Sequence, residues 1–212
     1  VAMNVQHPKL EDPNVRRAII HGIDVDSIIQ AAYMGKVERE CTLIPPGLVG
    51  HWAEAPCYER DVEKAKEYLA EAGLETLDIR LDLQDTAEDR IWAEIIQQNL
   101  AEVGINVELN PMDSSTYWTT TFGEQAVENN ELAVSGYSMQ NDPAWATMWF
   151  TCDQVGVWNA MAWCNEEYDA LHREAMVTLD TEKRHDLYVE MQKIWDDAAH
   201  TVWVTHGVRV YG

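Results

Sequence analysis

Basic residues and long apolar runs are both scarce in this sequence. Among 212 residues, 15 Lys and Arg stand against 37 Asp and Glu, which gives a formal net charge of −22. Phosphate binding needs a basic face, so this balance argues against a nucleic-acid partner and against docking on anionic lipid. No apolar run approaches the roughly 20 residues that cross a bilayer, and residues 1–4 do not begin a signal peptide. What remains is a globular composition of one large domain or two small ones.

The motifs of the common enzyme classes are also missing. The seven His residues never occur at His-x3-His spacing, and there is no His-Glu-x-x-His, so a zinc hydrolase has no support. A Gly-x-Ser-x-Gly elbow, a phosphate loop and a dinucleotide fingerprint are absent as well. Carboxylates are so abundant that some pair would fall at glycosidase spacing by chance on a solvated surface. The residues therefore predict neither catalysis, nor a metal site, nor a cofactor.

Four cysteines form two local pairs, Cys41 with Cys57 and Cys152 with Cys164. A disulfide across loops of this size stabilises a protein by about 3 kcal/mol on the chain-entropy model, and oxidised pairs would indicate a secreted or periplasmic compartment. Metal binding is an alternative, although the spacing is wider than in zinc knuckles. Four reduced, half-buried thiols in a cytosolic protein are the other alternative.

Apolar periodicity and capping residues predict alternating helices and strands, typical of an α/β domain. Helices are expected at 13–21, 25–33, 62–73, 86–103, 113–122, 165–178 and 181–199, with one more beginning at Asp142-Pro143. Strands are expected at 77–83, 105–109, 132–136 and 201–205. The first two of these strands and the helix between them form a β-α-β unit, which should be parallel and right-handed. Residues 36–60, rich in Pro and Gly, are expected to be an irregular surface loop pinned by the first cysteine pair.

A candidate ligand site lies in the segment from Gly136 to Trp145, where a predicted strand ends and a helix begins. This is the crevice position at which open α/β sheets bind ligands. A helix cap at Asp142, a first-turn Pro143 and packed aromatic rings would explain part of the segment without a ligand. Such packing leaves one polar run unexplained, namely Ser138, Gln140 and Asn141.

The charge distribution adds a constraint on that ligand. No Lys or Arg occurs between Arg90 and Arg173, whereas six of the nine Trp residues fall in this interval. A base-free, Trp-rich stretch favours a neutral or cationic ligand over an anionic one.

Several motifs, taken in chain order, resemble the extracellular solute-binding protein family 5. They are Asp12-x-x-Val15-Arg16-Arg17-Ala18, Ile23-Asp24-x-x-x-Ile28, Tyr33-x-Gly35, Ile44-Pro45-Pro46-Gly47, Asp61-x-x-Lys64-Ala65-Lys66-x-x-Leu69-x-x-Ala72-Gly73, Leu100-x-x-Val103-Gly104-Ile105-x-Val107, and Gly136-Tyr137 followed by Asp142-Pro143. Members of this family are the dipeptide-, oligopeptide- and nickel-type receptors of bacterial ABC importers. The resemblance covers essentially the whole chain, and the joint order of the motifs is more specific than any one of them.

The resemblance implies that residues 1–212 are one lobe of a class II periplasmic-binding-protein-like fold, with a mixed sheet flanked by helices. The chain resembles the second, C-terminal lobe, severed at the hinge at both ends. The implied partners are a small-molecule ligand, the first lobe of the same protein and the importer's membrane subunits. The implied location is periplasmic or extracellular, with a lipid anchor as one mode of attachment, and no catalysis or cofactor is implied. Some dipeptide receptors have a disulfide where Cys152 and Cys164 stand.

The resemblance also points to the residues that would touch a peptide-like or other small solute. The expected contacts are Tyr137, Ser138, Gln140, Asn141, Asp142 and Trp145, with Tyr117 and Trp118 as secondary candidates. Peptide receptors of the family hold the ligand's α-ammonium with an Asp at the position of Gln140, and some place an Arg for its carboxylate where Val134 and Ser135 stand. A neutral amide cannot supply the charge-assisted bond that an ammonium makes, although Asp142 is near enough in sequence to substitute. The alternative function is a ligand-sensing domain of a bacterial transcriptional regulator.

Overall fold

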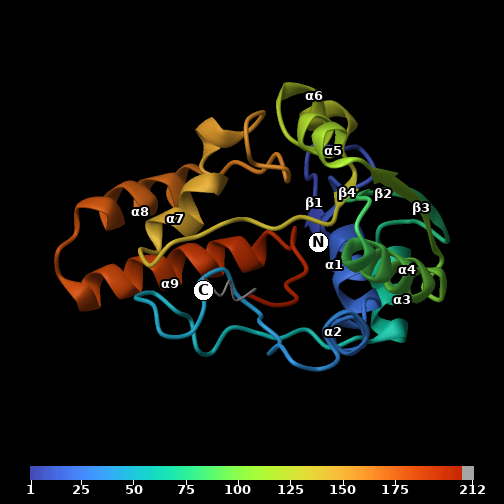
Figure 1. The fold of residues 1–212 in the computed structure, drawn as a ribbon, viewed down its shortest axis with the longest axis horizontal. Coiled ribbons are helices and arrows are strands. Elements are labelled where there is room, and N and C mark those ends of the chain that lie inside the picture. The colour runs from blue at the N-terminus through green and yellow to red at the C-terminus, as the bar shows by residue number, and fades with distance from the viewer. Residues whose placement is uncertain (207–212) are drawn as a thin grey trace.

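Strict alternation of apolar and polar residues over 77–84 and 105–109 produces the centre of the sheet. In a computed structural model that describes residues 1–206, β2 (Leu77–Gln84) and β3 (Ile105–Met112) pair in parallel, in register from Leu77 opposite Ile105. β4 (Leu132–Ala133) joins the other side of β2 in parallel, and β1 (Ala2–Met3) pairs with β4 antiparallel. The sheet is therefore mixed, with the order β1-β4-β2-β3 (Figure 1), and the predicted α/β class is confirmed.

Polar side chains start most of the helices by accepting hydrogen bonds from the free N–H groups of the first turn. These helices, each preceded by its cap, are Asp12 with α1 (Pro13–Gly22), Asp24 with α2 (Val25–Tyr33), Asp61 with α3 (Val62–Glu71), Thr86 with α4 (Ala87–Ala101), Asp113 with α5 (Ser114–Thr121), Asn165 with α8 (Glu166–Val177) and Asp180 with α9 (Thr181–Asp197). Their bounds agree with the sequence expectation to within a few residues. The sequence analysis missed α6 (Glu124–Asn129), because Gly123 before it supplies no side-chain cap.

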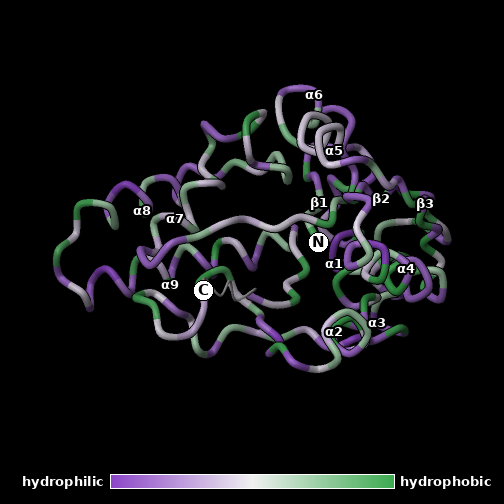
Figure 2. Tube along the Cα trace, in the orientation of Figure 1, coloured by the Kyte–Doolittle hydropathy of each residue, from purple (hydrophilic) through white to green (hydrophobic). Residues whose placement is uncertain are grey.

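Two hydrophobic cores divide the molecule. The sheet core joins β2 and β3 to α1, α3 and α4. The hairpin core lies between α8, α9 and the short helices α7 (Ala144–Thr147), η1 (Met148–Phe150) and η2 (Cys152–Gln154). Figure 1 shows α8 and α9 extending side by side away from the sheet, and Figure 2 shows apolar and polar residues mixed along both helices. Such mixing is expected of helices with one buried face.

Two predicted strands are shorter than expected. Residues 132–136 pair only at Leu132–Ala133, and residues 201–205 make a single bridge, from Thr201 to Ala2. The alternation after Thr201 has another cause: Val202 and Val204 pack in the sheet core, whereas Trp203 packs against the hairpin core. An extended segment between two cores shows the same period of two as a strand.

Both predicted cysteine pairs are disulfides, Cys41–Cys57 and Cys152–Cys164, which excludes the alternatives of a metal site or reduced thiols. The first bridge lies in residues 36–60, where the structure has neither helix nor strand. The second closes the segment between η1 and α8. Among the described residues, the helices are too short or too polar to span a bilayer.

Gly50 brings the 36–60 loop close against α9 and gives a first testable prediction. Its φ is +87°, and a Cβ added there would overlap the side chain of Tyr188. We expect Gly50→Ala to lower the free energy of unfolding by about 2 kcal/mol, from left-handed strain plus overpacking. Gly47, with φ +88° and open space around it, is the matched control, for which strain alone predicts about 1 kcal/mol. Equal losses in urea unfolding would contradict the close approach.

Candidate ligand-binding site

The two cores are linked by an extended segment, residues 135–142, which we call the crossing loop. It leaves β4 and runs to α7 (the yellow strand-like trace in Figure 1). At its start, Val134 N–H donates to the Asp82 carbonyl at 2.9 Å, and the Val134 carbonyl accepts from the Tyr117 hydroxyl at 2.6 Å. At its end, Asp142 Oδ1 accepts from Ala144 N–H at 2.9 Å and so caps α7. Both ends of the crossing loop are thus fixed to regular structure.

Between these ends the crossing loop has free hydrogen-bonding groups. Within residues 1–206, no hydrogen bond uses the backbone N–H groups of residues 135–141. Of the carbonyls in that range, Ser138 O accepts from Trp149 Nε1 at 3.1 Å. The side chains of Ser138, Gln140 and Asn141 are exposed and make no hydrogen bond to the described residues. Backbone groups normally find partners, so this edge can accept an extended ligand.

Five rings form a continuous aromatic surface beside the crossing loop, which we call the aromatic wall: Trp118, Phe122, Tyr137, Trp149 and Trp158. Trp118 stacks on Phe122 with centroids 4.9 Å apart, and Trp158 lies 6.4 Å from Trp118 and 6.2 Å from Trp149. Trp118 and Trp158 remain 39% and 43% exposed. Rings held edge to face with open faces can bury apolar or cationic groups of a ligand.

Tyr137 belongs both to the crossing loop and to the aromatic wall. Its hydroxyl donates to the Trp158 carbonyl at 3.0 Å and accepts from Ala160 N–H at 3.3 Å. Burial raises the pKa of this phenol well above its usual value, and the bond from Ala160 only partly offsets the rise. The hydroxyl is therefore a protonated, structural group that ties the loop to the segment closed by Cys152–Cys164.

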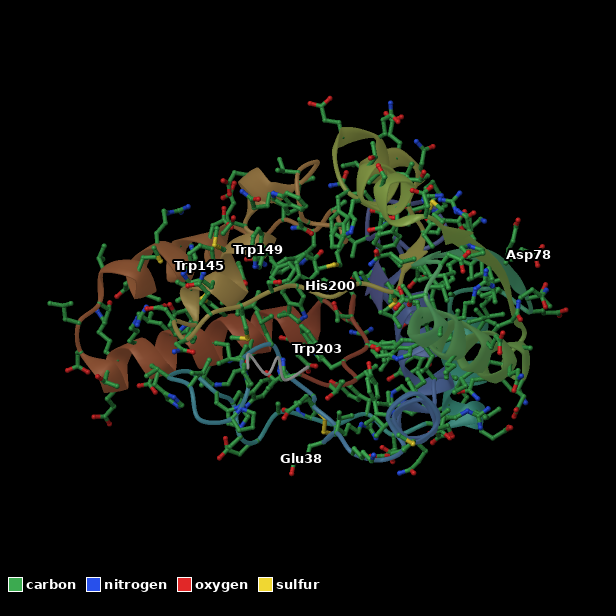
Figure 3. The ribbon with its side chains drawn as sticks, viewed as in Figure 1. Glu38, Asp78, Trp145, Trp149, His200 and Trp203 are labelled. Atoms are coloured by element: carbon green, nitrogen blue, oxygen red, sulfur yellow. A yellow bond between two sulfur atoms is a disulfide. The ribbon has the colours of Figure 1, made fainter. Side chains whose placement is uncertain are left out.

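The structure separates the sequence-predicted contacts into three groups. Tyr137 and Trp118 lie in the aromatic wall, and the free polar groups come from the crossing loop: Ser138, Gln140 and Asn141. Trp145 is 39% exposed on α7, one helical turn before Trp149 (Figure 3), and makes no ring contact with the wall among the described residues.

Tyr117 is placed differently from the expectation. It is 1% exposed, its hydroxyl is bonded to the Val134 carbonyl, and burial raises its pKa. Because it packs behind Trp118 and Phe122, it supports the wall and does not reach a ligand. The sequence analysis had assigned no role to Phe122, Trp149 or Trp158. The density of Trp in the base-free stretch was the only signal for them, and it did not show which rings would meet.

Asp142 is the one carboxylate among the candidates, and its charge is already paired. Arg184 Nη2 lies 2.7 Å from Oδ1 and 3.0 Å from Oδ2. The substitution of Asp142 for the missing ammonium-binding Asp would therefore compete with a formed ion pair. The crossing loop offers a ligand neutral amides and a hydroxyl in place of a free negative charge.

A separate groove of about 420 Å³ lies on the polar face of β2 and β3, away from the aromatic wall, and includes Lys9, Arg80 and Glu131. Its charges are largely satisfied internally: Lys9 bonds Glu131 at 3.0 Å, and Arg80 bonds Asp82 at 2.8 Å. In residues 1–206 there is no grouping of three His, Cys, Asp or Glu side chains suited to a metal ion. The crossing loop and the aromatic wall are the better candidate site because their polar groups and ring faces are free.

Comparison with known proteins places these features in a family. Residues 1–157 match the family model described as bacterial extracellular solute-binding proteins, family 5 Middle. The Dipeptide-binding protein of Escherichia coli (strain K12) is 30% identical over 217 residues, covering 97% of this chain and 39% of that protein. Heme-binding protein A of Haemophilus influenzae is also 30% identical, covering 98% of this chain and 39% of that protein.

The fold agrees with a solved relative. The dipeptide binding protein of Pseudoalteromonas sp. SM9913, solved in complex with Met-Leu, has a TM-score of 0.90 at 25% identity, covering 97% of this chain and 42% of that chain. The present chain thus spans about two fifths of the length of these relatives. Since the family model covers most of the chain and the fold is that of a periplasmic binding protein, this chain belongs to the bacterial extracellular solute-binding proteins of family 5.

Proposed function

We propose that residues 1–206 are one lobe of a two-lobe solute receptor, with the crossing loop and the aromatic wall facing the ligand cleft. Two chain segments far apart in sequence run side by side at one place, which supports this assignment. Val202 N–H donates to the Val1 carbonyl at 2.9 Å, and Met3 N–H donates to the His200 carbonyl at 3.0 Å. A lobe inserted into a longer chain would be connected through such a pair of adjacent strands.

The ligand of this site is a peptide-like or other small solute that binds partly through its main chain. The observation that carries this proposal is the row of free backbone groups at 135–141, set beside exposed ring faces. An extended peptide can pair with such an edge, and the rings can bury its side chains. The names of the relatives fit this class, since they include dipeptide-binding proteins.

The charge around the site favours a neutral or cationic solute. The crossing loop and the aromatic wall belong to the stretch without Lys or Arg, and Arg184, beside the loop's end, is paired with Asp142. The faces of Trp and Tyr rings attract cations and offer nothing to a carboxylate. An acidic peptide would therefore lack a partner on this lobe.

The whole protein would serve as the substrate-binding component of a bacterial ABC importer, in the periplasm or outside the cell, with no catalytic activity of its own. Its partners would be the other lobe and the importer's membrane subunits. The regulator alternative has no support among the relatives described above, which are named as binding proteins.

Titration of the 212-residue chain with Met-Leu, followed by ¹⁵N NMR, tests the site. We expect weak binding, because one lobe holds half the contacts, with shifts confined to residues 135–141 and the indoles of Trp118 and Trp158. Lys-Leu should bind at least as well as Met-Leu, and Glu-Glu more weakly. Trp158→Ala should weaken binding by about tenfold, since truncating a ring that anchors a ligand commonly costs more than about 1 kcal/mol.

The matched control is Trp52→Ala, which removes an indole from the 36–60 loop and should leave binding unchanged. Nanomolar affinity in this chain would show that the site is complete within one lobe and would contradict the two-lobe proposal. Shifts that avoid the crossing loop, or an undiminished affinity in Trp158→Ala, would place the ligand elsewhere.

A further inference from the structure

We propose that Arg184 is a positioning residue that holds the crossing loop in its ligand-ready place by pairing with Asp142. The inference rests on the proposed function, because it concerns the loop assigned there to the ligand. Arg184 lies on α9 in the hairpin core, 42 positions from its partner, and touches none of the free polar groups of the loop. Its effect on a ligand would therefore act through Asp142.

Three contacts fix Arg184 independently of the loop. Its Nε donates to the Ala175 carbonyl of α8 at 3.0 Å, and its Nη2 lies 3.2 Å from the Tyr188 hydroxyl. The guanidinium also sits 5.3 Å from the centroid of the Tyr188 ring. The side chain is only 20% exposed. A planar fork held on two helices is a rigid base to which a loop can attach.

Asp142 receives that attachment while it performs a second task. Its Oδ1 accepts both from Ala144 N–H at 2.9 Å and from Arg184 at 2.7 Å, so one carboxylate joins the loop, the start of α7 and α9. Burial alone would raise the pKa of Asp142, but the bonds from Arg184 and Ala144 reverse this, and the net shift is downward. The ion pair is thus maintained throughout the neutral range, and charge-assisted bonds of this kind are stronger than neutral ones.

The position of this pair along the loop explains its importance. Tyr137 and Ser138 are tied to residues 149–160 through the Trp158 carbonyl and the Trp149 indole. The next fixed point is Asp142, so Gln140 and Asn141 lie between the two attachments. Loss of the Arg184 pair would leave these two amides anchored on one side only.

Backbone ¹⁵N relaxation and hydrogen exchange of the ligand-free chain test the inference. In Arg184→Gln and in Asp142→Asn, the order parameters of Gln140 and Asn141 should fall from about 0.85 to below about 0.6. The amide oxygen introduced by Asp142→Asn can still accept from Ala144 N–H, so this variant isolates the loss of charge. Arg184→Lys keeps the charge without the planar fork and should give intermediate values. Binding of Met-Leu should weaken by about tenfold in Arg184→Gln, as expected for a lost charge-assisted bond.

The matched control is Lys183→Gln, which removes the same charge one residue away by breaking an exposed ion pair with Glu174. It should leave Gln140 and Asn141 unchanged. Order parameters that stay high in both Arg184→Gln and Asp142→Asn would overturn the proposal, as would equal loosening of the amides throughout α8 and α9. If Arg184→Gln fails to fold, Asp142→Asn and Arg184→Lys still decide the question. A loop that loosens in a chain that never binds Met-Leu would sustain the positioning role and refute the proposed ligand.

Discussion

Replacing Cys152 and Cys164 together by Ser is expected to lower the free energy of unfolding by about 3 kcal/mol. The bridge closes a sequence separation of 12 residues, and its loss lets the unfolded chain explore many more conformations. A domain of this size is stable by only about 5–15 kcal/mol, so the loss is a large share of the total. Urea unfolding of the oxidised chain and of the double variant measures the difference directly.

The same bridge also supports the candidate site. The closed segment carries Trp158, and its Trp158 carbonyl and Ala160 N–H hold the hydroxyl of Tyr137. Backbone bonds to the Gln154 carbonyl hold part of this segment, but its ends are joined by the disulfide. The double variant should therefore increase the exposure of the Trp158 indole and the hydrogen exchange of Ala160.

The Cys41–Cys57 bridge provides the matched control, because it closes a loop of similar size, with a sequence separation of 16. Replacing both of its cysteines by Ser should lower stability by about the same amount on the chain-entropy model. It should leave Trp158 and Ala160 unchanged, since it lies in the 36–60 loop. If both double variants disturb the aromatic wall equally, the Cys152–Cys164 bridge has no particular role at the site.

The sequence predicted most of the fold because its signals are local. Asp and Thr caps lie at the starts of the helices, and the alternation in β2 and β3 is strict, so element types and bounds could be inferred from neighbours in sequence. The elements that failed lack such signals. α6 follows Gly123 without a side-chain cap, and the alternation at 201–205 arises from two cores on opposite sides of one segment.

The candidate site could be predicted only in part, because its geometry is built from distant segments. The polar run at Ser138, Gln140 and Asn141 was visible as a departure from what a cap and packed rings require. The aromatic wall combines α5, η1 and the disulfide-closed segment, and nothing local shows that Trp118 meets Trp158. Likewise, Asp142 could be recognised as a cap, but its partner Arg184 lies 42 residues further along the chain.

His200 makes the chain sensitive to acid, and stability is expected to fall by about 1.4 kcal/mol per pH unit below about pH 6.5 from this residue alone. The ring is fully buried and lies against Trp195 and Trp163, with centroids 4.3 Å and 4.9 Å away. Burial lowers its pKa to about 3, and the charge of Arg16 adds to the shift. Nδ1 pairs with Thr201 Oγ1 at 3.0 Å, whereas Nε2 is buried without a partner among the described residues.

The sign follows from these contacts. An imidazolium donates from both nitrogens, and no acceptor among the described residues faces Nε2, so the folded state keeps the ring neutral. In the unfolded chain the ring takes up a proton below about pH 6.5. Acid therefore favours the unfolded state between about pH 6.5 and the folded pKa of about 3, and His200 has no effect above that window.

Comparison of the wild type with His200→Gln separates this residue from His172 and His206, whose pKa values burial also lowers. At about pH 4.5 the wild type should have lost about 3 kcal/mol more than the variant, each relative to its own stability at about pH 7.5. In the folded wild type, the ring signals of His200 should not titrate between about pH 8 and about pH 4.5. A normal titration of these signals, or parallel stability curves for the two proteins, would contradict the buried neutral ring.

The position of His200 determines where acid would act on the molecule. Its carbonyl accepts from Met3 N–H, so it lies where residues 1–3 meet residues 200–202, between the sheet core and the hairpin core. Protonation would require this junction to open before the distant parts of either core. Hydrogen exchange at about pH 5 should therefore rise first at Met3 and Val202, ahead of the centre of β2. A uniform rise across all three would show global unfolding, in which the junction is no weaker than the rest.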